Sequence, residues 1–221
     1  MKKQCEDTLR QQALRKQLIK IIQDKGISDD RILEAMMKVP RHCFMDTALD
    51  TIAYEDRAFP IAAGQTISQP YTVAYQTQLL QVKPYEKILE IGTGSAYQAT
   101  ILAEMKAQVF TIERQRELFD ERSRNYPFAG KYPLLKFFYG DGFKGLPTFA
   151  PFDKILVTAA APYVPQPLTE QLKPGGCLVI PVDEGNAQRM KRIKKDTNGN
   201  LIEELFDLFH FVPMVEGKNP K

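Results

Sequence analysis

Residues 87–104, KILEIGTGSAYQATILAE, decide the fold. An apolar run of strand length, Lys87–Ile91, ends in two closely spaced glycines and then passes into a segment of helix length. Glycines at such a turn let a ligand approach the backbone closely and leave the N–H groups of the helix free. The stretch therefore predicts an α/β sheet whose ligand lies beyond the carboxyl ends of the strands.

Further apolar runs of strand length follow this unit, and helix-length segments separate the first several of them. They are Gln108–Ile112, Leu135–Tyr139, Lys154–Thr158 and Cys177–Val182. Alternation of strand and helix predicts a parallel sheet with helices on both faces. Two last candidates, Gln188–Lys194 and Leu201–Val212, flank an Asn-Gly pair that favours a hairpin. We expect a doubly wound, mostly parallel, seven-stranded α/β sheet with an antiparallel C-terminal edge.

The N-terminal part of the chain differs from the rest, because it contains few segments with the pattern of a strand. Residues 4–25 place leucines and isoleucines near helical spacing, and Gly26 is a natural stop. Ser28 and the two aspartates after it favour the start of a second short helix, which ends before Pro40. We therefore expect a helical N-terminal extension at 1–60 and a ligand-binding domain at 61–221, joined in one continuous structural unit.

Composition limits the classes of function. The chain has 221 residues, 43% of them hydrophobic, with a net charge of +3, which suits one domain and gives little reason to expect a nucleic-acid partner. The most basic cluster, Arg189–Lys195, fits an edge strand with a wet face. No segment has the length or composition of a membrane span or a leader peptide, so we expect a cytoplasmic protein.

Three cysteines, Cys5, Cys43 and Cys177, lie far apart in the sequence. Their odd number and wide spacing argue against a disulfide framework and against a zinc site, and we predict no metal. Cys177 begins an apolar run and is expected to be a buried structural thiol.

Acidic residues stand at or near the ends of three consecutive predicted strands. Glu90 precedes the glycines Gly92 and Gly94, and a third glycine of the dinucleotide pattern is missing because that position is Tyr97. An acid at Glu90 would repel phosphate and favour a cationic or uncharged ligand. The pattern argues against a pyrophosphate and makes Glu90 a candidate contact of another ligand.

The ends of the next two predicted strands also carry acidic residues that could contact such a ligand. Glu113 follows the second strand at a spacing that suits the two hydroxyls of a ribose. Asp141 follows the third strand and can accept a hydrogen bond from an adenine amino group. Adenosine with a positively charged attachment fits these features, and S-adenosylmethionine is the obvious candidate. Acids at strand ends are also common helix caps, which is the structural alternative.

The segment GQTISQPY, residues 64–71, is unusually polar for a turn. Pro70 suits the first turn of a helix, so the residues before it lie at a helix N-terminus, which favours anions. Ser68 can donate a hydrogen bond to an anionic group there, while Thr66 and Gln65 line the same polar edge. A simple helix cap at Ser68 is the alternative reading.

GQTISQPY, LEIGTGSAYQA, YGDG and AAAPYVPQPLTEQLKPGG occur in this order, and the chain from about Ile32 to FVPMVEGK resembles the protein-L-isoaspartate O-methyltransferases. The resemblance implies a Rossmann-like methyltransferase sheet and an enzyme that uses S-adenosylmethionine to methylate the free carboxylate of isoaspartyl residues in damaged proteins and peptides. The ester closes to a succinimide, which can hydrolyse to normal aspartate.

The resemblance also implies that 61–221 is the catalytic domain and that its C-terminal strands bind substrate, and it implies roles for particular residues. Ser68 corresponds to the active-site serine, and the cofactor contacts correspond to the segment around Thr66, the Gly92–Gly94 loop, Glu113, and Asp141 with Gly142. One departure is Ala96, which stands where the family usually has a third glycine. We expect Ala96 in the first helical turn, where alanine is harmless.

The sequence also leaves other functions open. They include a methyltransferase of RNA or a small molecule, a nicotinamide-dependent oxidoreductase, and a catalytically silent adenosine-binding module. His42 and His210 have no partner at a recognisable spacing, so we expect structural roles for both. We expect a monomer.

Overall fold

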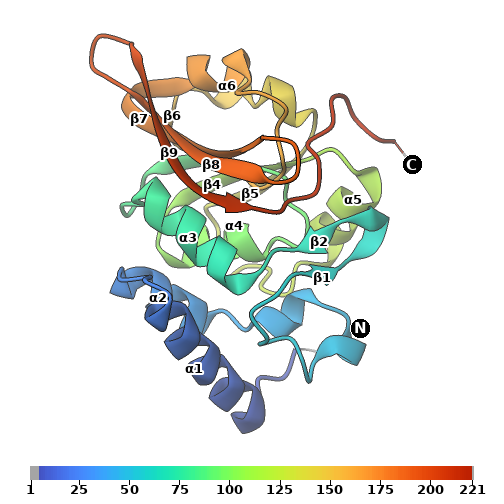
Figure 1. Ribbon diagram of the computed structural model, residues 1–221. Coiled ribbons are helices and arrows are strands. Elements are labelled where there is room, and N and C mark those ends of the chain that lie inside the picture. Colours follow the sequence, from blue (N-terminus) through green and yellow to red (C-terminus); the bar gives the residue numbers. More distant parts are fainter. Residues whose placement is uncertain (1–4, 221) are drawn as a thin grey trace.

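The computed structural model describes residues 5–220, so residues 1–4 and 221, including the first residue of the predicted 4–25 helix, lie outside the described part. Its main feature is a seven-stranded sheet in the order β5-β4-β3-β6-β7-β8-β9 (Figure 1). The strands are β3 Lys87–Ile91, β4 Gln108–Glu113, β5 Leu135–Tyr139, β6 Phe152–Val157, β7 Leu172–Asp183, β8 Gln188–Lys195 and β9 Leu201–Phe209. The first five are parallel, and β8 and β9 are antiparallel, which confirms the predicted fold class.

Strand β3 lies at the point where the sheet changes direction. Strands β4 and β5 continue from β3 towards one edge, whereas the chain later returns to place β6 on the other side of β3. Connections that leave adjacent strands in opposite directions open a crevice at their carboxyl ends. The glycine loop after β3 therefore lies where a ligand is expected.

Helices cover both faces of the sheet: α3 Pro70–Leu80, α4 Tyr97–Glu104, α5 Arg116–Asn125 and α6 Gln166–Glu170. Alternate strand residues enter two separate cores, as the period of a strand requires. Ile88 packs in the core that also holds residues of α3 and α4, and Leu89 and Ile91 pack in the opposite core with Leu168 of α6. A strand residue therefore faces one of two apolar layers.

The N-terminal part contributes two helices, α1 Leu9–Asp24 and α2 Asp30–Lys38, and two short 3₁₀ turns at Arg41–Phe44 and Thr47–Leu49. Thr8 caps α1 in a capping box with Gln11, and Asp29 caps α2. Both helices contact α3, and their apolar side chains join the core beneath it, on one side of the sheet (Figure 1). The domain boundary at residue 60 stays a prediction.

One expectation about an individual strand is wrong. Strand β8 contains the basic cluster but pairs with β7 and β9, so it is not an edge; β9 is. Strand β9 pairs with the side of β8 that faces away from β7, and it satisfies the backbone hydrogen-bonding groups on that side. Within residues 5–220, no helix combines the length and the apolar character needed to cross a bilayer.

The cysteines also differ from expectation. Cys5 and Cys43 are joined by a disulfide across 38 residues, although their spacing gave no sign of it. The turn at Arg41–Phe44 folds back against the segment before α1, and this tertiary contact brings the two sulfurs together. The pair lies beside His42, and the ligand atoms of the three residues lie within 4.8 Å of one another. Cys177 is a buried free thiol, as predicted.

Candidate active site

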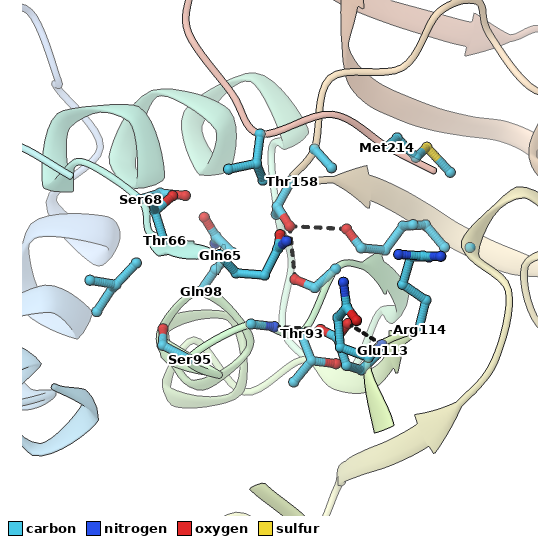
Figure 2. Close-up of a pocket in the computed structure, with 18 of the residues that line it drawn as sticks. Gln65, Thr66, Ser68, Thr93, Ser95, Gln98, Glu113, Arg114, Thr158 and Met214 are labelled. Carbon is cyan, nitrogen blue, oxygen red and sulfur yellow. Dashed lines mark hydrogen bonds between the residues drawn. The ribbon is translucent and has the colours of Figure 1, made fainter. Parts of the chain in front are cut away.

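A cavity opens at the carboxyl ends of β3, β4 and β6. Its walls come from the 65–68 segment, the glycine loop, the end of β4, Thr158 with Ala159 after β6, and the C-terminal tail at 212–215. In Figure 2, Ser68 and Thr66 lie at one side of this cavity, and Glu113 with Arg114 lies at the other. Segments far apart in the sequence thus meet at the crevice that the strand order creates.

The glycine loop allows close approach to the backbone. Gly92 has φ +97°, and a Cβ built there would lie 2.6 Å from the hydroxyl oxygen of Thr158. That hydroxyl donates to the carbonyls of Ile91 (3.0 Å) and Gly92 (2.8 Å), which ties β6 to the loop. Gly94 also has positive φ, +51°. Side chains at either position would fill the cradle or strain the backbone.

Glu113 carries the carboxylate predicted at the end of the second strand. Its two oxygens accept the backbone N–H groups of Gly94 (2.9 Å) and Gln115 (2.8 Å). Burial raises the pKa of the Glu113 carboxyl, and these N–H groups oppose the rise. The carboxylate lines the cavity, where its remaining lone pairs suit the two hydroxyls of a ribose.

The end of β5 is placed only in part as predicted. Gly142 lines the cavity, and a Cβ there would lie 2.5 Å from Ile91 Cγ2 and 3.3 Å from Met214 Cε. Asp141 does not line the cavity, and its Oδ1 accepts the Phe143 N–H (3.0 Å) as the cap of a short 3₁₀ turn. A direct cofactor contact from Asp141 stays a prediction.

Glu90 is placed differently from the prediction. It is 0% exposed and lies beneath the cavity, because the alternation of β3 points it towards the core under α3 and α4. Its carboxyl accepts the Thr111 hydroxyl, which lies 2.7 Å from the Thr93 hydroxyl of the glycine loop. Burial raises the pKa of Glu90 to about 8. Glu90 therefore supports the loop from below and does not repel ligands in the cavity.

Ala96 is also placed differently from the prediction. It precedes α4 with φ +68° and ψ 11°, which is left-handed backbone. The loop turns tightly there, since the Ala96 N–H donates to the Thr93 carbonyl (2.7 Å) and the Ala96 carbonyl accepts the Thr100 N–H (3.0 Å). An alanine in this conformation costs on the order of 1 kcal/mol relative to glycine. The expectation of a harmless first-turn position was wrong.

The polar 64–71 segment forms the other wall. Strand β2, Thr66–Ile67, pairs with β1, Phe59–Pro60, and α3 then begins with Pro70 at its first position, as predicted. Ser68 lies between the strand and the helix and is half-buried. The helix N-terminus was predicted to receive a substrate anion, but the N–H of Tyr71 already donates to the Asp56 carboxylate at 2.8 Å.

A second cavity adjoins the first one. Lys25, the 56–58 segment, the start of α3 and the stretch 208–212 form its walls. Four residues line both cavities, namely Thr66, Ser68, Thr158 and Val212. Ser68 therefore lies at the junction of a deep cavity and an open groove.

Several lining residues were not predicted. They are Ser95, Gln98, Arg114 and Gln115, and they line the cavity together with Thr93 of the predicted glycine loop. Each lies within a few residues of a predicted contact, so the glycine loop and the end of β4 were partial signals. The C-terminal tail gave no local signal for its place over the cavity. Hydrogen bonds fix it there, including Met214 N–H to the Ala160 carbonyl at 2.7 Å.

The two histidines have different surroundings. His42 is buried and contacts the Tyr54 hydroxyl (2.8 Å) and the Glu6 carbonyl (3.0 Å), in agreement with a structural role. His210 is exposed and lines the groove just after β9 ends, so it lies outside the observed strand although the predicted strand extended to Val212; its structural role stays a prediction.

The fold and the cavity together define an S-adenosylmethionine-dependent methyltransferase. The residues fit this cofactor, because Gly92 and Gly142 leave room that a Cβ would fill and Glu113 presents a carboxylate at the spacing of a ribose. Tyr97 occupies the place of the third dinucleotide glycine and is buried against Phe44, which argues against a pyrophosphate there.

Comparisons with known proteins give the family. The model of the protein-L-isoaspartate(D-aspartate) O-methyltransferase family matches residues 12–219. A protein-L-isoaspartate O-methyltransferase of Flavobacterium johnsoniae is 51% identical over 97% of this chain and 100% of its own length. One of Cytophaga hutchinsonii is 51% identical over 98% of each chain. The chain belongs to the protein-L-isoaspartate(D-aspartate) O-methyltransferase family.

A solved structure agrees with this result. It is described as a protein-L-isoaspartate O-methyltransferase of Plasmodium falciparum in complex with S-adenosyl-L-homocysteine. It superposes with a TM-score of 0.78 at 26% identity and covers 91% of this chain and 98% of that one.

Proposed function

We propose that this chain methylates the free carboxylate of L-isoaspartyl residues in damaged proteins and peptides, and that Ser68 orients this carboxylate. Family membership supports the reaction and the cofactor, S-adenosylmethionine. The observation that carries the role of Ser68 is its place at the junction of the cavity and the groove. A group transferred between two ligands must pass through such a junction.

The cofactor would be held by the Gly92–Gly94 loop, Glu113 and Gly142, with Thr66 near the reactive end. When bound, S-adenosylmethionine supplies a methyl group on a sulfonium, which a carboxylate oxygen can attack. The groove beside Ser68 would hold the peptide. Its wall at 208–212 includes the end of β9, the edge strand of the sheet, so peptide main chain can pair there without a particular sequence.

The protein supplies alignment, because a carboxylate with an ordinary pKa of roughly 4 is already ionised at neutral pH. The nucleophilic oxygen must be held about 3 Å from the methyl carbon with water excluded. A neutral hydroxyl such as that of Ser68 can donate one hydrogen bond and leave the charge on the second oxygen. A lysine or arginine at the same place would weaken the nucleophile.

Methyl-labelled S-adenosylmethionine and two peptides of the same sequence, one isoaspartyl and one aspartyl, test the reaction. We expect base-labile label on the isoaspartyl peptide alone. Label on neither peptide, with S-adenosylhomocysteine still bound, would refute the substrate and leave the cofactor site standing.

The role of Ser68 is tested by Ser68→Ala in the same assay, with Ser123→Ala as the matched control at an exposed position of α5. Loss of one orienting group should lower kcat by roughly 100-fold or more, since small misplacements of a reacting atom have effects of that size. The affinity for S-adenosylhomocysteine should stay within about twofold. An unchanged kcat in Ser68→Ala would rule out the orienting role.

We further expect a monomer that acts in the cytoplasm and has no nucleic-acid partner. These expectations depend on composition, above all on the small net charge of +3. Sedimentation of the purified chain tests the monomer directly.

A further inference from the structure

The Asp56 carboxylate is a buried acid that none of the roles above uses. It belongs to the loop between the N-terminal helices and β1, and its side chain is 8% exposed. Oδ1 accepts the backbone N–H of Tyr71 at 2.8 Å. Oδ2 accepts the Gln69 amide at 3.2 Å and the Lys25 ammonium at 2.6 Å. These donors lie directly after α1 or at the start of α3.

These contacts cap α3 from a distance. Gln69 is the N-cap residue of α3, yet its side chain makes no capping hydrogen bond, and Pro70 has no N–H to offer. The first free N–H of the helix is therefore that of Tyr71, and Asp56 satisfies it. A carboxylate at this place also interacts favourably with the helix dipole. The Gln69 side chain returns a second hydrogen bond to the Asp56 carbonyl at 3.0 Å.

Ser68 directly precedes this capped junction. On its other side, the pairing of Thr66 with Pro60 and of Ile67 with Phe59 fixes the backbone. Ser68 therefore lies between a two-residue strand and the N-terminus of α3, which the hydrogen bond to Asp56 holds in place. A strand of two residues is too short to fix the backbone alone. The Asp56 contacts therefore determine the orientation of the backbone at Ser68.

The loop that carries Asp56 is itself rigidly held. Arg41 is 0% exposed, and its guanidinium donates to the carbonyls of Ala53 (3.1 Å) and Arg57 (3.3 Å), on both sides of Asp56. Burial lowers the pKa of Arg41 to about 10, so it stays charged at neutral pH. Because the buried Arg41 side chain hydrogen-bonds to the loop on both sides of Asp56, it fixes the position of Asp56.

Lys25 completes the arrangement. Asp56 lines the groove beside Ser68, where an uncompensated carboxylate would repel an anionic substrate. The Lys25 ammonium neutralises it from the end of the helical segment and lies 5.4 Å from the centre of the Tyr71 ring. The residue that ends the N-terminal helix thereby contributes to a groove that also contains Asp56, 31 residues later in the sequence.

We propose that Asp56 is the positioning residue of Ser68, acting by capping α3, with Lys25 as its counter-ion. The inference rests on the proposed role of Ser68 in isoaspartyl methylation. It also explains why the start of α3 cannot receive the substrate carboxylate: an internal carboxylate already occupies it.

A double-mutant cycle tests the proposal with full-length variants Asp56→Ala, Ser68→Ala and the double variant, assayed with the isoaspartyl peptide. Asp56→Ala should lower kcat by roughly 10- to 100-fold. In the Ser68→Ala background the same change should cost less than about threefold, because the group that Asp56 positions is already gone. The affinity for S-adenosylhomocysteine should stay within about threefold.

Asp7→Ala is the matched control, since it also breaks an ion pair of the N-terminal part, with Arg15, but lies outside both cavities. Its kcat should equal that of the wild type. Equal losses from Asp56→Ala in both backgrounds, or a kcat of Asp56→Ala within twofold of wild type, would overturn the proposal.

If Asp56→Ala does not fold, Gln69→Ala replaces it, because it removes two of the hydrogen bonds to Asp56 without leaving a buried charge. The same non-additive loss is then expected, of several-fold size, and a wild-type kcat would overturn the proposal. A wild-type enzyme that leaves the isoaspartyl peptide unlabelled would refute the proposed function instead, so the two failures are distinct.

Discussion

Replacement of Glu90 by glutamine should make the protein more stable at high pH and should flatten its pH dependence. Glu90 is 0% exposed, and its Oε1 has no hydrogen-bond partner among the described residues. Burial is the main cause that raises the pKa of Glu90 from its ordinary value to about 8, so the folded protein holds this carboxyl protonated at neutral pH. Glutamine has nearly the same shape and stays neutral at every pH.

The direction of this pH effect follows from the difference between the pKa of Glu90 in the folded and in the unfolded chain. Below about pH 4.5 the carboxyl is protonated in both the folded and the unfolded chain, and its stabilising contribution is fully present. Between about pH 4.5 and about pH 8 only the unfolded chain ionises, so the free energy of unfolding falls by up to about 1.4 kcal/mol per pH unit. Over the whole interval the loss reaches roughly 5 kcal/mol.

Urea unfolding of both proteins from pH 5 to pH 9, at constant ionic strength, measures this effect. The difference in free energy of unfolding, Glu90→Gln minus wild type, should rise with pH by a total of about 2 to 5 kcal/mol. Glu117→Gln removes one carboxylate from an exposed position of α5 and should give a curve parallel to that of the wild type. Curves of Glu90→Gln and wild type that stay parallel within about 0.5 kcal/mol would refute the reasoning.

Ionisation of Glu90 should also reach the cofactor site. The Thr111 hydroxyl links the Glu90 carboxyl to Thr93 in the glycine loop. We expect the affinity of wild type for S-adenosylhomocysteine to weaken above about pH 8, and that of Glu90→Gln to stay constant.

Reduction of the Cys5–Cys43 disulfide, or Cys5→Ser, should remove up to roughly 4 kcal/mol, because the bond closes a loop of 38 residues. The Tm should fall by about 8–15 °C in a reductant, and thiol titration of the unreduced chain in denaturant should give one thiol; three thiols, or an unchanged Tm, would contradict this. Gly92→Ala should weaken S-adenosylhomocysteine binding more than about tenfold, because φ is +97° and the new Cβ would lie 2.6 Å from a threonine hydroxyl. Gly130→Ala, at φ +84° with open space around it, should cost only the backbone strain of roughly 1–2 kcal/mol; equal affinity in the two variants would show that the contact is not the cause.

Local patterns in the sequence were sufficient for the sheet and for much of the cavity. The period of the strands, the Asn-Gly turn and the glycines after β3 predicted all seven strands, and a cavity lies at the strand ends where the ligand was expected. Glu113, Gly92, Gly94 and Gly142 line the cavity because strand ends in a parallel sheet meet at one edge, and Thr66 and Ser68 line its other wall; their roles in binding and catalysis stay predictions. Pro70 marked the start of α3 by the same local logic.

Other features depended on contacts that no local pattern encodes. The predicted and observed bounds of β3 coincide, yet Glu90 is buried because helices cover both faces of this strand, and no local pattern shows what lies over each face. Ala96 takes left-handed backbone because the loop must turn between two fixed elements. The cap that Asp56 gives α3, the disulfide and the C-terminal tail over the cavity each join segments distant in sequence. Sequence periodicity reports which face of an element is apolar, whereas only the packed structure decides which distant side chain fills a given place.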